Sequence, residues 1–320
     1  MTVAALLVAY TLLIVVLVPR LLRGAGWPDR APRLAVGLWL ALSWSALGAA
    51  VLAGVALTVP SVPLSTDLAS MLHACVVSLQ DSYATPAGAV VAASGLVVVA
   101  GLLVRVACCA VAGLARAARA RRDHAVTLEM VGHRAPALDA VVITHDVAAV
   151  YCLPGRHRRI VLTSAALDVL GERELAAVLA HERAHLAGRH HLILGCADVL
   201  ARAFPAIPLF ALARREIGRL LELSADDVAA RQHPRLSIAA ALAVLAGGGE
   251  DIGLAASGPT ALGRVRRLLT PAHPLGPGRT ALGGLLIVTA LVVPVLVATG
   301  PLLGLGHALY CPLPAGPPSG

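Results

Sequence analysis

Four long apolar stretches constrain the fold of this chain more than any other feature. They cover residues 3–18, 34–59, 86–104 and 281–303, and Leu21 and Leu22 can extend the first. Each approaches or exceeds the ~20 residues that a helix needs to cross a bilayer. With 58% hydrophobic residues, 14% charged residues and a mean hydropathy of +0.81, the chain is too apolar for a soluble protein of 320 residues. We therefore predict four transmembrane helices.

The first stretch has an alternative reading as a signal peptide. No basic segment precedes it and no small-residue cleavage site follows it, which favours a membrane helix.

The distribution of arginine predicts the orientation in the membrane. The chain contains no lysine, and its arginines are concentrated in the loop 19–33 and in the region 116–279. The loop 60–85 and the tail 304–320 contain none. By the positive-inside rule, both termini are expected outside a bacterial plasma membrane and the region 116–279 in the cytoplasm. This distribution explains the net charge of +8 without direct nucleic-acid binding. We expect a basic face toward anionic lipid headgroups.

The domain organisation follows from these stretches. Residues 1–115 hold helices 1–3, residues 280–303 hold helix 4, and 304–320 form a short tail. The 116–279 region is long enough for a domain with its own core. It is expected to be an α+β domain inserted between the third and fourth membrane helices. Short strands are predicted at 140–144, 148–153 and 160–163, and helices at 172–190 and 214–232.

The apolar segment 191–212 imitates a fifth span. Asp198 and Arg202 interrupt it, and Pro205 and Pro208 break any single helix. We therefore expect it to pack in a core or to lie on the membrane surface.

The stretch His181-Glu182-Arg183-Ala184-His185 matches the pattern HExxH. Positions i and i+4 lie on one face of a helix, so the two histidines can bind one metal ion. Two imidazoles beside a carboxylate are typical of a catalytic zinc ion, where the carboxylate takes a proton from a water molecule that attacks an amide carbonyl. We therefore predict a zinc metalloendopeptidase in which His181 and His185 bind one Zn²⁺ and Glu182 is the catalytic base.

A catalytic zinc ion needs a third protein ligand. Glu222 lies 37 residues after His185, and Asp226 follows it by one helical turn on the same face. We predict that Glu222 binds the metal and that Asp226 orients a histidine ligand from behind.

His190 is harder to assign from the pattern. Continuing the helix places it about 140° round from His185, so it can donate to an oxyanion or have a capping or packing role.

The six cysteines divide between the two sides of the membrane. Cys75 and Cys311 lie in the two segments predicted outside the cell, where a disulfide between them can persist. The other four match no zinc motif and are expected to be buried apolar residues: Cys108, Cys109, Cys152 and Cys196.

The element Glu222-x-x-Ala-Asp226 after HExxH resembles the gluzincin metallopeptidases. The order of spans resembles the BlaR/MecR antirepressor family of membrane peptidases. Four stretches are similar to the core of that family: Tyr151–Gly155, Ile160–Thr163, Glu174–His185 and Arg189-His190. The resemblance implies a signal-transducing protease whose activation leads to cleavage of a cytoplasmic winged-helix repressor of the BlaI/MecI type, and thereby to transcription regulation.

The chain departs from this family in its sensor. Members that sense β-lactams carry an outer penicillin-binding domain with an SxxK motif, and this chain has no lysine. We therefore expect a short form whose stimulus arrives through the loop 60–85, through the spans or through a separate sensor partner. A homo-oligomer also stays open from the sequence.

Two other functions stay open from the sequence. A quality-control or CAAX-type endopeptidase similar to HtpX would use the same site on membrane proteins. A receptor or scaffold without proteolytic activity would keep zinc for stability. An intramembrane protease is disfavoured, because the HExxH helix carries too many charges for the bilayer.

Overall fold

The computed structural model describes residues 2–22, 24–58, 85–155, 159–247, 254–271 and 273–310. Cys75 and Cys311, the predicted disulfide partners, lie outside these residues. Among them, four helices are long and apolar enough to cross a membrane, which is consistent with a membrane protein. These are α1 (Thr2–Leu22), α2 (Pro32–Thr58), α4 (Pro86–Val131) and α11 (Pro277–Tyr310), the last over Pro277–Gly300.

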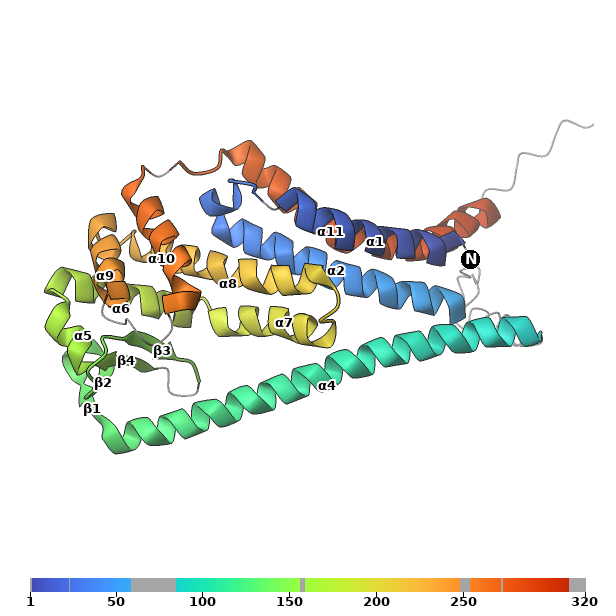
Figure 1. Ribbon diagram of the computed structural model, residues 1–320. Coiled ribbons are helices and arrows are strands. Elements are labelled where there is room, and N and C mark those ends of the chain that lie inside the picture. The colour runs from blue at the N-terminus through green and yellow to red at the C-terminus, as the bar shows by residue number, and fades with distance from the viewer. Residues whose placement is uncertain are drawn as a thin grey trace, which may run out of the picture.

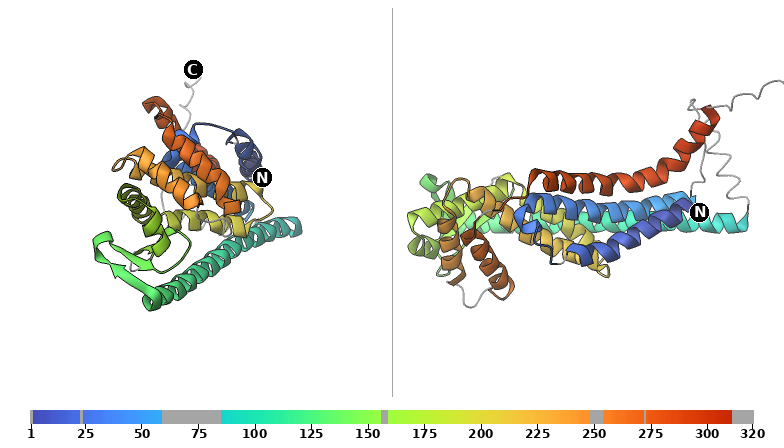
Figure 2. Two further views of the ribbon diagram at one scale, coloured as in Figure 1. Left: turned by 60° about the vertical axis from the view of Figure 1, so that its left-hand side comes forward. Right: turned by 90° about the horizontal axis from the view of Figure 1, so that it is seen from above.

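The four long helices run alongside one another in an elongated bundle (Figure 1, Figure 2). Helix α2 lies at its centre and packs against α1, α4 and α11. A short 3-10 turn, η1 (Pro28–Arg30), connects α1 to α2.

Helix α4 is much longer than the apolar stretch that predicted it. It continues past residue 104 to Val131 and ends at Gly132, whose N–H donates to the carbonyl of Leu128. The added residues are rich in Ala and Arg and contain no Pro. Their high helix propensity extends α4 beyond the end of its apolar part. The predicted domain start at residue 116 therefore falls inside a helix.

A four-stranded sheet follows α4, with strand order β1-β2-β4-β3. Strand β1 (Gly132–Ala135) pairs antiparallel with β2 (Ala140–Ile143), and β2 pairs parallel with β4 (Arg159–Thr163). Strand β3 (Val150–Leu153) pairs antiparallel with β4 and forms an edge of the sheet. The turn η2 (Pro136–Leu138) links β1 to β2. Strand β1 was not predicted, since its sequence GHRA carries no apolar alternation.

Helices α5 (Ser164–Val169) and α6 (Glu172–Ala187) contact the sheet. Helix α9 (Arg235–Gly247) packs on α6, and α10 (Leu254–Leu269) packs on α9. Ile160 and Leu162 of β4 pack against Leu179 and Leu186 of α6, so α6 lies directly on the sheet. Small side chains let α9 approach α6 closely, with Ala177 and Ala180 against Ile238.

The apolar segment after α6 forms a helical hairpin, α7 (His190–Ala203) and α8 (Pro208–Ala229). As the prolines predicted, the segment is not one helix, and α8 begins at Pro208 in the first helical turn. The hairpin extends along α2 and α4 (Figure 1). Arg105 of α4 donates to the carbonyl of Ala203 at its tip.

The largest core cluster joins this hairpin to the membrane helices. Leu209 and Ile217 of α8 are fully buried and belong to the same cluster as Trp39 and Leu47 of α2. The hairpin therefore packs in a core that it shares with α2. Part of the hydrophobic core of the region 116–279 is thus formed together with a membrane helix.

Candidate metal centre

Helix α6 carries the HExxH residues on its inward face. Its first turn holds Glu172 and Glu174, the placement of acidic residues that the helix dipole favours, and its last turn holds His185. His181 is buried together with Val178 and Ala184 on one side of the helix. This side faces α8, which packs against α6 and supplies Glu222.

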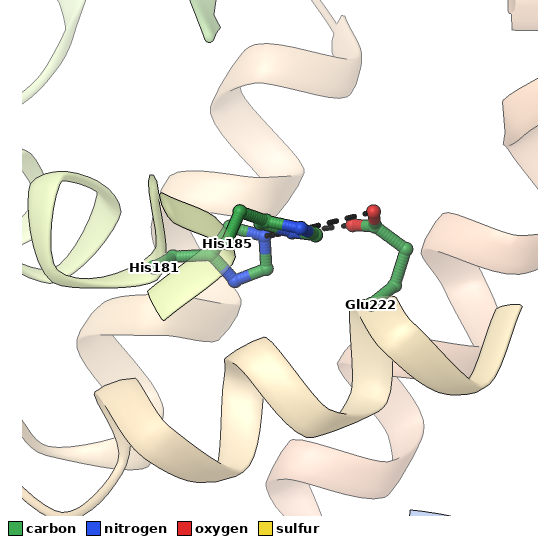
Figure 3. Close-up of side chains that lie close together, drawn as sticks. All are labelled: His181, His185 and Glu222. Atoms are coloured by element: carbon green, nitrogen blue, oxygen red, sulfur yellow. Dashed lines mark hydrogen bonds and ion pairs between the residues drawn. The ribbon is translucent and has the colours of Figure 1, made fainter. Parts of the chain in front are cut away.

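His181, His185 and Glu222 converge, as Figure 3 shows. The Nε2 atoms of the two histidines lie 3.1 Å apart. Glu222 places Oε2 3.5 Å from Nε2 of His181 and Oε1 3.4 Å from Nε2 of His185. One potential ligand atom from each of the three residues lies within 4.8 Å of the others. The structure thus brings the three predicted ligands to one point.

Each histidine is held from behind through its Nδ1 atom. Oδ1 of Asp226, whose side chain is fully buried, lies 3.0 Å from Nδ1 of His181. Nδ1 of His190 lies 2.9 Å from Nδ1 of His185. With both Nδ1 atoms engaged, both Nε2 atoms face the carboxylate of Glu222, where each can bind a metal in its deprotonated form. Two imidazole nitrogens and one carboxylate, each oriented in this way, fit a catalytic zinc ion.

His190 lies against His185, whereas the helical projection placed it on another side. The projection was wrong because α6 ends at Ala187 and Arg189 takes a left-handed conformation with φ 50°. This turn directs His190, the first residue of α7, back onto His185. A Cβ on Gly188 would lie 2.5 Å from Nε2 of His190, so the close approach requires glycine there. Nδ1 of His190 thus faces His185, which supports a positioning role for this ring, and His190 also lines the cavity beside the metal centre.

Arg264 of α10 completes the site and was missed in the sequence. Its Nη2 and Nε atoms donate to Asp226 at 2.7 Å and 2.9 Å, and its Nη1 lies 3.0 Å from Oε2 of Glu222. The residue lies 83 positions from His181 along the chain. No spacing rule connects it to HExxH, and in the sequence it is one of three arginines near the end of an apolar segment.

Charges in the site compensate one another. Burial alone would raise the pKa of Asp226, but hydrogen bonds from Arg264 and His181 outweigh it and lower that pKa to about 2. Burial acts in the same way on Glu222, where His181 and Arg264 lower the pKa to about 2. For His181, burial lowers the pKa, and its bonds to Asp226 and Glu222 raise it to about 9. Both carboxylates are therefore ionised at neutral pH, as Glu222 requires to bind a metal and Asp226 requires to orient His181.

Glu182 lies between the metal ligands and the edge strand β3. Burial raises the pKa of its carboxyl group. The thiol and the backbone N–H of Cys152 hydrogen-bond to it, although the sequence predicted only a packing role for this cysteine. Burial and the charge of Glu182 raise the pKa of the Cys152 thiol to about 12, so the thiol stays a donor. A partly buried carboxyl group with a raised pKa beside a metal centre is suited to proton transfer.

A cavity of about 790 Å³ opens onto these residues. Cys152 and Pro154 line it on the side of β3, and His185, Glu222 and Arg264 line it at the metal centre. Leu186 and Leu194 add apolar surface on the α6 and α7 side. The site is thus accessible to a substrate and is bordered by an edge strand.

The comparisons with known proteins agree with this chemistry. Residues 115–272 match Peptidase family M48. The matched range runs from α4 to just beyond α10 and contains every residue of the metal centre, so the region is an M48 peptidase domain, and M48 peptidases are zinc-dependent. No curated protein and no solved structure matches the chain. The narrower resemblance to the BlaR/MecR family stays a prediction.

Proposed function

We propose that this protein is a membrane-embedded zinc endopeptidase that hydrolyses peptide bonds inside protein substrates. The observation that carries the proposal is the convergence of His181, His185 and Glu222 beside Glu182, within a domain that matches family M48. The chemistry that a bound zinc ion supplies here is acidification of a water molecule and polarisation of the scissile carbonyl.

The residues of the chain supply the remaining steps. Glu182 accepts a proton from the water molecule and passes it to the leaving amine, a transfer for which its raised pKa is suited. Asp226 and His190 fix the rings of His181 and His185. Arg264 keeps Glu222 and Asp226 in place by binding both carboxylates. The thiol of Cys152, which lines the cavity, hydrogen-bonds to Glu182.

The substrate we favour is a cytoplasmic transcriptional repressor of the winged-helix BlaI/MecI type. The resemblance to the BlaR/MecR family supports this choice, and the arginine distribution supports a cytoplasmic location for the peptidase domain. On this proposal the protein is an antirepressor that relays a signal received by its membrane helices or by a separate sensor.

The test compares cells that express the wild type with cells that express Glu182→Gln. This variant keeps the metal ligands, so zinc content should stay at the wild-type level, and cleavage should fall by about 10²–10⁴-fold. Terminal-peptide proteomics should identify one cytoplasmic DNA-binding protein whose cleavage depends on Glu182. If the cellular phenotype persists in the Glu182→Gln strain, the protein acts as a receptor or scaffold and the peptidase proposal is wrong.

A second candidate function is quality control of membrane proteins, as in HtpX-like or CAAX-type endopeptidases. The observation that favours it is the cavity wall: Leu194 belongs to α7, and α7 runs along the membrane helices α2 and α4. A segment emerging from the bilayer could therefore reach the cavity along this hairpin. Membrane-protein fragments in the same proteomics experiment, with no cleaved repressor, would support this function over the regulatory one.

A further inference from the structure

A second large cavity lies outside the metal centre, at the ends of the membrane helices. It has a volume of about 690 Å³ and is bordered by the segment after α1, by the ends of α8 and α10, and by the start of α9. Gly26 and Arg30 contribute from the first segment, and Pro274 contributes from the linker to α11. Because α1 ends at Leu22 and α11 begins at Pro277, the cavity lies where two spans leave the membrane.

The lining of this cavity has an excess of positive charge. Its two carboxylates are already neutralised: Asp227 forms bonds of 2.8 Å and 2.9 Å to Arg267, and Asp29 lies 2.7 Å from Arg219. Arg30 and Arg231 are exposed in the cavity wall, and among the described residues neither has an ion-pair partner. Two guanidinium groups with unused donors are a typical binding site for a phosphate group.

Two further arginines make the wall rigid. Arg235 donates to the carbonyls of Leu268 and Arg267 at the end of α10. Arg267 donates to the backbone carbonyl of Asp29 at 3.0 Å and so ties α10 to the segment after α1. The unpaired arginines are thus mounted on elements that are fixed relative to each other, which lowers the entropy cost of binding an anion.

An apolar cavity of about 390 Å³ adjoins the basic one. The same two chain segments line both: Gly26 and Pro274 face the basic cavity, and their neighbours Trp27 and Leu275 face the apolar one. The rest of its wall comes from α2 and α11, including Leu38 and Leu286, and Arg279 lies at its edge. Tryptophan and arginine at this level are typical of the membrane interface.

We propose that the two cavities together hold one anionic phospholipid. Its headgroup phosphate lies between Arg30 and Arg231, and part of an acyl chain lies in the apolar cavity against Trp27. A positively charged cavity adjoins an apolar cavity at the ends of membrane helices. This combination favours a phospholipid over a free phosphate ion, because inorganic phosphate has no apolar group that could occupy the apolar cavity. This site is independent of the proposed peptidase activity.

The test measures lipid binding to the full-length protein in detergent by native mass spectrometry. Phosphatidylglycerol is titrated against phosphatidylcholine, and inorganic phosphate is added as a competitor in a separate arm. We expect phosphatidylglycerol to bind in preference to phosphatidylcholine. In the double variant Arg30→Gln/Arg231→Gln its affinity should fall about thirtyfold, roughly fivefold for each arginine.

The matched control is Arg119→Gln/Arg122→Gln. It removes two exposed arginines from α4, on the same predicted side of the membrane, and should leave the preference unchanged. An equal loss in the control would assign the effect to general surface charge and overturn the proposal. Competition by inorganic phosphate as strong as that by the lipid would overturn it too, since it would identify a phosphate-ion site. Thermal unfolding of each variant checks that the protein stays folded.

A second measurement addresses the apolar half of the site. Phosphatidylglycerol with brominated acyl chains should quench the fluorescence of Trp27 more than brominated phosphatidylcholine does. This excess quenching should disappear in Trp27→Phe and in Arg30→Gln/Arg231→Gln. Equal quenching by the two lipids in the wild type would show that no selected acyl chain lies against Trp27.

Discussion

Replacing Arg264 with glutamine should lower the free energy of unfolding of the zinc-free protein by about 3–5 kcal/mol. Asp226 is fully buried, and Arg264 supplies two hydrogen bonds to it and a contact of 3.0 Å to Glu222. Without the guanidinium group, His181 is left as the cation beside two carboxylates whose pKa values are about 2 in the intact site. A buried charge that loses its partner is among the most destabilising single changes.

The measurement is urea unfolding of the zinc-free protein in detergent micelles, followed by far-ultraviolet circular dichroism. The control is Arg266→Gln, an exposed arginine two residues later on the same helix, which should change stability by no more than about 0.5 kcal/mol.

A double-mutant cycle isolates the ion pair. Asp226→Asn removes the charge that Arg264 balances, so the double variant should be more stable than the sum of the single effects by about 1–3 kcal/mol. Our account of Arg264 is refuted if Arg264→Gln unfolds with the same midpoint as Arg266→Gln, or if the two single effects add.

Four further predictions concern the hairpin, its ion pairs and the metal. Leu209→Ala should cost about 2–5 kcal/mol because this side chain is fully buried in the core shared with α2, whereas Leu192→Ala, at an exposed position, should cost little; urea unfolding measures both. Burial alone would raise the pKa of Asp198, but its bonds to Arg202 and Arg214 outweigh burial and lower that pKa. Asp198→Asn removes these ion pairs and should lower the free energy of unfolding by about 1 kcal/mol at neutral pH. Because this pKa is lowered, the contribution is fully present above about pH 4 and disappears as the pH falls through the folded-state value, so thermal unfolding of wild type and variant should converge in acid. His190→Phe keeps a ring against His185 but removes the hydrogen bond, and should weaken zinc binding about 10–100-fold in a chelator competition. Removing the metal with a chelator should abolish cleavage and lower the unfolding temperature, and zinc at about 100 times its dissociation constant should restore about 2.7 kcal/mol.

The part of the site that lies on single helices was predictable from the sequence. The spacing of His181 and His185, and of Glu222 and Asp226, is one helical turn in each pair, so a local pattern is enough to place each pair on one face. The pairing of the two helices followed from chemistry, because a catalytic zinc ion needs a third ligand. The apolar stretches likewise marked all four long helices, since hydrophobic length is a property of a continuous segment.

Contacts between distant segments were not predictable in this way. Arg264 reaches the site from α10, and Cys152 reaches Glu182 from the edge strand β3. Periodicity indicates which face of an element is buried, and it does not identify the element that this face meets. The prediction of where His190 lies failed for a related reason. The helical projection assumed a continuous helix, and the left-handed residue Arg189 interrupts that helix.

The α8 helix links the metal centre to the membrane helices, and this link constrains how a signal can act. Leu209 and Ile217, in its first half, are buried in the core shared with α2, and Glu222 and Asp226 lie in its second half. Thirteen residues separate Leu209 from Glu222, a distance of about 20 Å along an unbroken helix. Because packed helices move as rigid bodies, a shift of α2 that displaces α8 also moves Glu222. The metal centre changes if α6, which packs against α8 and carries His181 and His185, does not follow. If the protein is an antirepressor as proposed, an input from the membrane helices can reach the third metal ligand in this way without any contact at the cavity itself.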